Sequence, residues 1–196
     1  IYKKLGQVTN ILCGRKKFDY LNVLGPLGNT FTNWDNPNNI PILVGGGTGL
    51  APLLNMHKKC LALGLKHALV LGARNSAQHF LKHNPEEGIY LCTDDGSLGI
   101  KGTVMTPLEQ ILKKHRNPHL FSCGPEPMLK AVQALALKNR IVCQLSVESY
   151  MACGTGLCQG CAVTKNDRDG SSSSIRRYSL VCIKGPVYKA GEVLFD

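Results

Sequence analysis

Short apolar runs alternate with amphipathic stretches through the middle of the chain. The runs end in glycine or other turn residues, which is typical of buried strands. They cover residues 40–44, 67–72, 88–92, 119–122 and 141–147. Between them, apolar positions recur with helical spacing over residues 50–63, 104–114 and 126–138. Strands that alternate with helices in this order predict an α/β fold, in which an open parallel sheet carries helices on both faces.

The two segments that flank this region have a different composition and pattern. Residues 1–36 hold short strand-like runs, such as Val23-Leu24, that are broken by turn residues. After residue 147 glycine and cysteine are dense, and the polar residues 165–177 predict a flexible loop. Short strands are expected at residues 178–182 and 187–195. These changes in composition and pattern predict three domains: residues 1–36, 37–146 and 147–196.

Composition limits the classes of function. Hydrophobic residues make up 43% of the 196 residues and charged residues 18%, which is enough apolar material for a buried core. Lys and Arg total 23 against 13 Asp and Glu, and a formal charge of +10 suits an anionic cofactor, nucleic acid or an acidic partner. No basic stripe interleaved with aromatic residues supports nucleic-acid binding. No apolar run reaches the roughly 18 residues of a membrane span, and no signal peptide is recognisable. We expect a cytoplasmic protein and read the chain as part of a longer one.

Four of the nine cysteines have the spacing of a metal or cluster site. They follow the pattern C-x4-C-x2-C-x20-C and are Cys153, Cys158, Cys161 and Cys182. The first three have plant-type [2Fe–2S] spacing, in which a remote fourth cysteine completes the ligands. Gly154, Gly156 and Gly160 allow backbone N–H groups to approach the sulfurs. Zinc is the alternative metal, although structural zinc sites usually join two short knuckles, and four buried free cysteines are the third interpretation. The cysteines without ligand spacing are expected to be small hydrophobic side chains: Cys13, Cys60, Cys92 and Cys143.

Glycines follow the first strand of the predicted sheet. The segment 45–49 leaves this strand and opens a helix, where backbone N–H groups can approach a pyrophosphate at the positive end of the helix. It departs from the strict G-x-G-x-x-G pattern at Leu50, and an ordinary strand-to-helix turn is the alternative. At the end of a later strand, Cys123 and Gly124 begin the motif CGPEPM. A small thiol there would lie against a flat nicotinamide ring, although a tight turn after a buried cysteine explains the same residues.

Taken together, these motifs resemble those of the ferredoxin-reductase-like superfamily. GGGTGLAP (45–52), CGPEPM (123–128) and the C-terminal cysteine pattern carry this resemblance. More narrowly, the chain is similar to the electron-transfer subunits of heteromeric dihydroorotate dehydrogenases. The stretches that support this are VLGPLGNTF (23–31), LGAR (71–74), TDDGSLGIKG (93–102) and SVESYMACGTGLCQGCAV (146–163).

The resemblance implies an α/β fold built on an open parallel nucleotide-binding sheet flanked by helices. It identifies residues 1–36 as a remnant of an FAD-binding β-barrel, 37–146 as an NAD(P)-binding domain and 147–196 as a small [2Fe–2S] domain. The family's R-P-x-S flavin signature is missing, so most of the flavin site is expected to lie upstream or to be lost. The implied cofactors are a [2Fe–2S] cluster, FAD and NAD.

The resemblance also implies a relay. In the family, a partner catalytic subunit oxidises dihydroorotate at FMN, and single electrons pass through the cluster to FAD, which reduces NAD. This chain would be the electron-transfer subunit of such a heterotetramer in pyrimidine biosynthesis.

The family pattern carries over to individual residues of this chain. Iron ligands would be Cys153, Cys158, Cys161 and Cys182. Pyrophosphate contacts would be Gly45, Gly46, Gly47, Thr48 and Gly49. Cys123 and Gly124 would border the nicotinamide, Arg74 and Asp94 or Asp95 would contact the adenosine half, and Thr9, Leu27 and Gly28 would touch the flavin.

Two other functions stay open at this point. One is the small subunit of a related NAD(P)H–ferredoxin or sulfide-type oxidoreductase. The other is a zinc-stabilised, nucleotide-binding protein without enzyme activity. The closing GPVYKAGEVLFD and the cysteine motif MACGTGLCQGC favour the dihydroorotate-type subunit over the related oxidoreductase.

Overall fold

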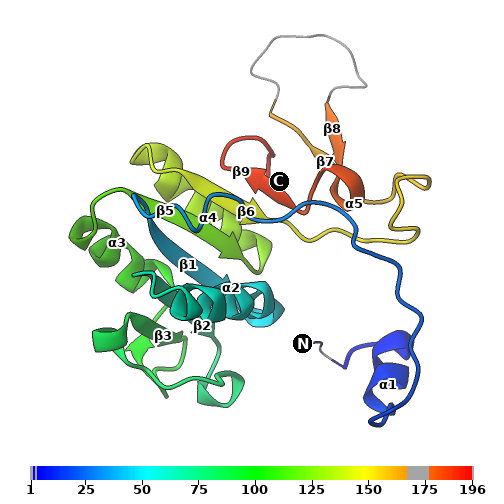
Figure 1. Ribbon diagram of the computed structural model, residues 1–196, viewed down its shortest axis with the longest axis horizontal. Coiled ribbons are helices and arrows are strands. Elements are labelled where there is room, and N and C mark those ends of the chain that lie inside the picture. The colour runs from blue at the N-terminus through cyan, green and yellow to red at the C-terminus, as the bar shows by residue number, and fades with distance from the viewer. Residues whose placement is uncertain (1, 3, 167–176, 196) are drawn as a thin grey trace.

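A seven-stranded sheet organises the computed structural model, which describes residue 2, residues 4–166 and residues 177–195 (Figure 1). Its strands run in the order β4-β3-β2-β1-β5-β6-β9. They are β1 (Ile40–Gly46), β2 (Ala68–Ala73), β3 (Ile89–Thr93), β4 (Ile100–Lys101), β5 (Pro118–Cys123), β6 (Cys143–Ser146) and β9 (Val187–Lys189). All neighbouring pairs are parallel except β6 with β9. The predicted α/β fold with an open, mostly parallel sheet is confirmed.

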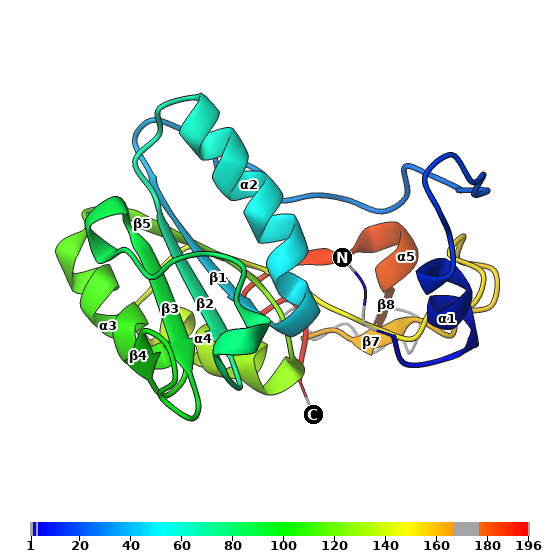
Figure 2. The same ribbon diagram turned by 90° about the horizontal axis from the view of Figure 1, so that it is seen from below.

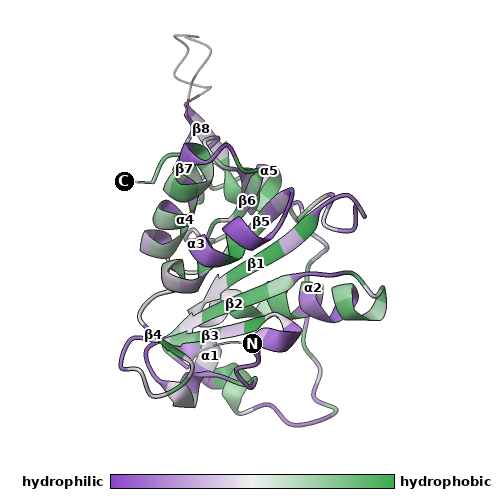
Figure 3. Ribbon diagram, turned by 90° about the vertical axis from the view of Figure 1, so that its left-hand side faces the viewer, coloured by the Kyte–Doolittle hydropathy of each residue, from purple (hydrophilic) through white to green (hydrophobic). Residues whose placement is uncertain are grey.

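Helices cover both faces of this sheet (Figure 2). On one face lies α2 (Leu50–Ala62), which buries Leu53 and Met56 against strand residues such as Phe121. On the other face lie α3 (Met105–Lys114) and α4 (Glu126–Lys138), whose apolar sides meet in a second core. Single 3-10 turns are η1 (Gly47–Gly49), η2 (Ser76–Gln78) and η3 (Pro85–Glu87). The strands between these layers are apolar (Figure 3), as expected of a sheet buried on both faces.

The register of the strands brings their carboxyl ends to one edge. Gly45 of β1 pairs with Cys123 of β5, and Gly46 pairs with Gly72 of β2. The loops that follow β1, β2 and β5 therefore start at the same level. In open α/β sheets this edge is where ligands bind.

The C-terminal residues form a small second core. The hairpin of β7 (Ala162–Thr164) and β8 (Tyr178–Leu180) leads into α5 (Val181–Lys184). The predicted strand over residues 178–182 therefore ends at Leu180, because the chain turns helical there. The flexible loop predicted at residues 165–177 falls mostly on residues 167–176, which lie outside the described residues.

The N-terminal segment differs from its prediction. Residues 7–13 form a helix, α1, and the described residues before Ile40 contain no strand. Thr9 explains the helix, because its Oγ1 accepts hydrogen bonds from the backbone N–H groups of Leu5 and Gly6 at 2.9 and 3.0 Å. The strand expected at Val23-Leu24 is wrong, since these side chains are exposed and lie beside no strand of the described chain. A strand needs a neighbour for its backbone hydrogen bonds.

The end of this N-terminal segment is anchored to the C-terminal part of the chain. Gly28 has φ +71° and packs so tightly that an added Cβ would lie 2.5 Å from the carbonyl oxygen of Gly185. The Asn29 side chain donates to the carbonyls of Lys184 and Val187 at 2.9 and 2.8 Å. It also accepts from the backbone N–H of Val187 at 2.8 Å. Residues near positions 28 and 186 are thus held together.

Predictions for the isolated cysteines are confirmed in three cases. Cys60, Cys92 and Cys143 are buried among apolar side chains, and burial raises the pKa of each thiol to about 11, 11 and 12. Cys13, which was expected to be a small hydrophobic side chain like the others, is exposed on α1 instead of packed among apolar side chains.

Candidate functional site

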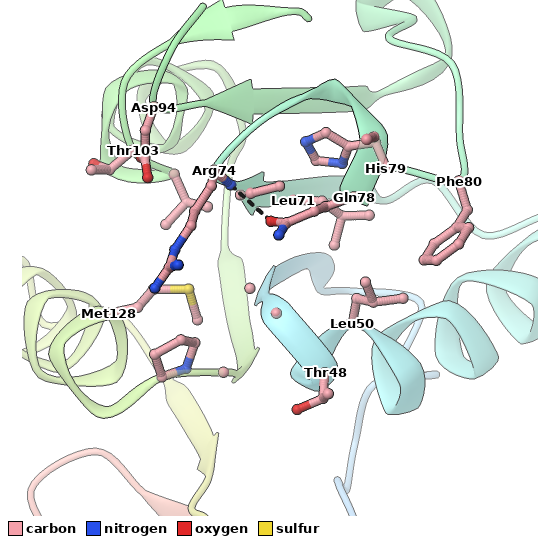
Figure 4. A pocket seen from close by; sticks show the side chains of 18 of the residues that line it. Thr48, Leu50, Leu71, Arg74, Gln78, His79, Phe80, Asp94, Thr103 and Met128 are labelled. Atoms are coloured by element: carbon pink, nitrogen blue, oxygen red, sulfur yellow. Dashed lines mark hydrogen bonds between the residues drawn. The ribbon is translucent and has the colours of Figure 1, made fainter. Parts of the chain in front are cut away.

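A cavity of about 760 Å³ opens at the carboxyl edge of the sheet (Figure 4). Residues that follow β1, β2, β3, β5 and β6 all contribute to its wall. The wall includes Gly46 at the end of β1 with Gly47 and Thr48 after it, Arg74 after β2, Asp94 after β3, Gly124 after β5 and Glu148 after β6. Five strands that are neighbours in the sheet thus direct loops into one space, as a dinucleotide site requires.

The glycine loop divides into residues that face the cavity and residues that support it. Gly46, Gly47 and Thr48 line the cavity. Gly45 faces the core instead, because an added Cβ would lie 2.8 Å from the Leu53 side chain. Gly49 packs against the backbone of Cys123 and Gly124, where a Cβ would overlap the carbonyl of Cys123. Gly45 and Gly49 therefore position the loop rather than line the cavity.

The β5–α4 turn lies directly beside this loop. An added Cβ on Gly124 would lie 3.0 Å from the backbone N and O of Gly46. Gly124 lines the cavity, whereas Cys123 is 5% exposed just below it. Burial raises the pKa of the Cys123 thiol and the negative charge of Glu148 adds to this, against a lowering by the hydrogen bond with Ser146. The thiol is therefore neutral near pH 7.

Two candidates for the adenosine half lie on neighbouring strand ends. Arg74 points across the cavity toward Met128, and Asp94 lies beside Thr103 (Figure 4). The backbone N–H of Arg74 donates to Gln78 Oε1 at 3.1 Å, which holds the loop that carries the guanidinium. Asp95 instead accepts from the backbone N–H and the hydroxyl of Ser97 at 2.9 and 2.7 Å, and these bonds lower its pKa. Of the two acidic residues, Asp94 is the one that lines the cavity.

The four spaced cysteines form two pairs. Cys161 and Cys182 are buried in the C-terminal core with their sulfurs 3.2 Å apart. Cys153 and Cys158 lie on the loop before β7 and are more accessible. Within the described residues, no group of three or more His, Cys, Asp or Glu side chains is assembled as a metal site.

Backbone amides already point at the accessible pair. The N–H groups of Thr155 and Cys158 both donate to Cys153 Sγ at 3.4 Å, and Gly160 N–H donates to Cys158 Sγ at 3.5 Å. The amide hydrogen bonds lower the pKa of the Cys153 thiol to about 6. Two thiol pairs with amide donors suit a [2Fe–2S] cluster, whose four thiolates carry negative charge that N–H groups stabilise.

The residues expected to contact the flavin do not lie together around one pocket. Thr9 uses its hydroxyl to start α1, and Gly28 packs on Gly185. Leu27 lies near Gly154 of the cysteine loop, since a Cβ on that glycine would be 3.5 Å from its side chain. These three residues build no common pocket among the described residues, and we assign no step of the chemistry to them.

Comparison with known proteins agrees with this geometry. The domain family "Iron-sulfur cluster binding domain of dihydroorotate dehydrogenase B" matches residues 148–194, and "Oxidoreductase NAD-binding domain" matches residues 43–134. The curated protein "Dihydroorotate dehydrogenase B (NAD(+)), electron transfer subunit" of Caldanaerobacter subterraneus subsp. tengcongensis is 37% identical over 195 residues, which is 100% of this chain and 74% of the relative. Its counterpart in Geobacillus kaustophilus is also 37% identical, over 99% of this chain and 73% of the relative.

The chain belongs to the family of dihydroorotate dehydrogenase B electron-transfer subunits. It is therefore an oxidoreductase subunit that transfers electrons, as predicted from its motifs. The family matches fit the predicted cofactors, an iron–sulfur cluster, FAD and NAD. No helix in the described parts of the chain is long and apolar enough to cross a membrane.

A solved structure supports the fold of this family member. A chain from the study "Insights into flavin-based electron bifurcation via the NADH-dependent reduced ferredoxin-NADP oxidoreductase structure" superposes with a TM-score of 0.79. It is 28% identical, and the match covers 100% of this chain and 68% of that chain. The likeness includes the C-terminal unit as well as the nucleotide-binding sheet.

Sequence reasoning missed one wall of the cavity. Glu148 was not singled out, although it follows the end of β6 by two positions. The signal was available, because the rule that placed Cys123 at the carboxyl edge applies to every parallel strand. Phe80, 72% exposed on the cavity rim, was also missed, and its loop has no pattern that marks it.

Proposed function

We propose that this chain passes electrons from a partner catalytic subunit, which oxidises dihydroorotate at FMN, through a [2Fe–2S] cluster and FAD to NAD. The observation that carries the proposal is the arrangement of the four cysteines. A buried pair and an amide-supported accessible pair follow a nucleotide cavity in one chain. The proposal includes a heterotetramer and a cytoplasmic role in pyrimidine biosynthesis.

The proposed domain limits are residues 1–36, 37–146 and 147–196. The separate core around Val181 and Tyr188 supports the last limit. The two domain-family matches, at 43–134 and 148–194, fall on either side of it.

In the cluster domain, Cys153, Cys158, Cys161 and Cys182 would supply four thiolates. A bound [2Fe–2S] cluster would supply one-electron chemistry. The N–H groups of Thr155, Cys158 and Gly160 stabilise thiolate charge on the accessible side, and the apolar core excludes water from the buried side.

In the nucleotide domain, the backbone of Gly46, Gly47 and Thr48 would hold the pyrophosphate at the start of α2. Arg74 would add a positive charge to this contact, and Asp94 would accept from the adenosine ribose. Gly124 leaves room for the nicotinamide, and the neutral thiol of Cys123 lies beneath it. FAD supplies the exchange between single electrons and a hydride when it is bound.

Anaerobic purification followed by iron analysis and EPR tests the proposal. We expect two irons per chain and an S = 1/2 signal on reduction, both lost in Cys158→Ser and kept in Cys13→Ser, which changes an exposed cysteine outside the pattern. A colourless protein that carries zinc and gains no cluster on reconstitution with iron and sulfide would refute the electron-transfer function.

A second candidate function is that of a ferredoxin-linked relative, and the superposition on the bifurcating oxidoreductase chain favours it. The two candidates differ in their electron donor. Reduction of the cluster by dihydroorotate in the presence of the catalytic partner supports the first function. Reduction by ferredoxin alone supports the second.

A further inference from the structure

The charged residues in the cavity wall follow an ordered pattern. Of the described residues that line the cavity, those with a full charge are Asp94, Arg74 and Glu148. Asp94 follows β3, Arg74 follows β2 and Glu148 follows β6, and the strand order is β3-β2-β1-β5-β6. Along this edge an acidic side chain is therefore followed by a basic one, then by the glycine loop and Gly124, and finally by a second acidic side chain.

The oxidised nicotinamide dinucleotide has a matching order of charges. Its pyrophosphate is anionic and lies in the middle, and its nicotinamide ring carries a positive charge at one end. If the pyrophosphate lies on the glycine loop beside Arg74, the nicotinamide end reaches Gly124 and Glu148. Reduction to NADH removes the positive charge of the ring and leaves the rest of the molecule unchanged.

The backbone that carries Glu148 is fixed by its neighbours. Ser146 is the register partner of Cys123, and the two side chains are hydrogen-bonded. Val147 between Ser146 and Glu148 is buried, with its N–H donating to the carbonyl of Pro186 at 2.8 Å. Glu148 then lines the cavity, close enough for its charge to act on the Cys123 thiol.

Arg74 and Glu148 extend from strand ends on opposite sides of the glycine loop. Three strand steps separate β2 from β6, and neighbouring strands are about 4.8 Å apart, so the strand backbones that lead to these two residues are separated by roughly 14 Å. Glu148 is exposed before a nucleotide binds, so its attraction for a cation strengthens as the bound dinucleotide displaces water from around the carboxylate.

We infer that Glu148 makes this site discriminate between the two redox forms of the nucleotide, binding NAD⁺ in preference to NADH through the charge of the nicotinamide ring. The inference rests on the proposed function, since it requires the dinucleotide to lie in this cavity. It assigns Glu148 a positioning and specificity role. The role also suits the reaction direction, because NAD⁺ is the substrate and NADH the product to be released.

Calorimetric titration of the full 196-residue chain with NAD⁺ and with NADH, separately, tests the inference. In Glu148→Gln we expect NAD⁺ to bind about tenfold more weakly, a change of about 1.4 kcal/mol, and NADH to bind within twofold of wild type. Glu148→Asp retains the charge and should retain most of the preference. Glu109→Gln removes the same charge from α3, outside the cavity, and should change neither affinity.

The outcomes distinguish the role of Glu148 from the presence of the nucleotide site. Equal weakening of both ligands in Glu148→Gln, or no change in either, overturns the role of Glu148 and leaves the nucleotide site standing. Binding of neither ligand by the wild-type chain overturns the nucleotide site as well. Thermal unfolding of each variant shows whether a lost affinity reflects a lost fold.

Discussion

The sulfurs of Cys161 and Cys182 lie 3.2 Å apart although 21 positions separate the two residues in sequence. The β7–β8 hairpin and α5 bring them together inside an apolar core that also holds Val147, Val181 and Tyr188. Cys158 is exposed by comparison. Half of the proposed ligand set is thus part of the folding core, and half lies on a loop.

This difference predicts unequal effects of two serine substitutions. Cys161→Ser places a hydroxyl in the buried core and should lower the free energy of unfolding of the cluster-free protein by about 1–3 kcal/mol. Cys158→Ser should change it by less than about 0.5 kcal/mol, because the side chain is exposed. Urea unfolding of the reduced, iron-free proteins measures both. Equal destabilisation by the two substitutions would contradict a greater contribution of the buried cysteine to the fold.

Gly49 is expected to tolerate no side chain. Its φ is −62°, so alanine suits the backbone, but a Cβ would overlap the carbonyl of Cys123. Gly49→Ala should cost about 2–3 kcal/mol of stability and weaken NAD⁺ binding, because the β1–α2 and β5–α4 loops must separate.

Gly64→Ala is the matched control for this substitution. Gly64 has φ +64° and open space around it, so alanine there costs only the backbone strain of about 1 kcal/mol. Its NAD⁺ affinity should equal that of wild type. Calorimetry and urea unfolding of both variants give the comparison, and an unchanged affinity in Gly49→Ala would contradict the loop contact.

Asp94 should disfavour a phosphate on the adenosine ribose. Its carboxylate lines the cavity at the end of β3, where it would repel the 2′-phosphate of NADP⁺. Asp94→Asn should raise the affinity for NADP⁺ relative to NAD⁺ about tenfold. Titration with both nucleotides measures the ratio, and Glu86→Gln on the surface serves as control. A ratio that does not move would place the adenosine elsewhere.

The His57–His67 pair predicts a loss of stability in mild acid. His67 Nδ1 lies 2.8 Å from the carbonyl of Leu65 and so donates to it, which leaves Nε2 to accept from His57 Nδ1 at 2.7 Å. A second proton between the two rings would remove this bond. Burial, with the charge of His67, lowers the pKa of His57 below its usual value of 6.5. Stability is therefore complete above about pH 6.5 and falls as the pH drops toward the folded-state pKa.

Urea unfolding between pH 5 and 8 checks this dependence. The free energy of unfolding of wild type should fall below about pH 6.5. The free energy of unfolding of His57→Gln should depend less on pH. Some dependence should remain, because His115 and His119 also have lowered pKa values. Parallel curves for the two proteins would rule out His57 as a source of the dependence.

The repeating strand–helix region was predictable because its signals are local. Residues 126–138 were predicted as a helix, and α4 has these bounds. Apolar runs closed by glycine located β1 and β5, and their carboxyl ends located Thr48 and Gly124. In contrast, β4 has only Ile100 and Lys101, too few residues for a periodic pattern.

Elements whose form depends on distant parts of the chain were harder to predict. The apolar run beginning at Tyr178 has the composition of a strand throughout, but Val181 and Cys182 turn into α5 to meet Cys161. His57 is 7% exposed and is hydrogen-bonded to His67, which lies ten positions away, just before β2. Such pairings have no local signature.

The anchorage of Asn29 affects the order of events during synthesis. Its side-chain partners, the carbonyls of Lys184 and Val187, lie 155 and 158 positions further along. The sheet from β1 to β6 is complete once about residue 146 has left the ribosome, and domains fold as they emerge. Asn29, which follows the exposed Phe18 and Tyr20, therefore cannot dock until residues 184–187 have emerged. These hydrogen bonds therefore form late, after the strands β1 to β6, which lie between Asn29 and Lys184 in the sequence, have already paired.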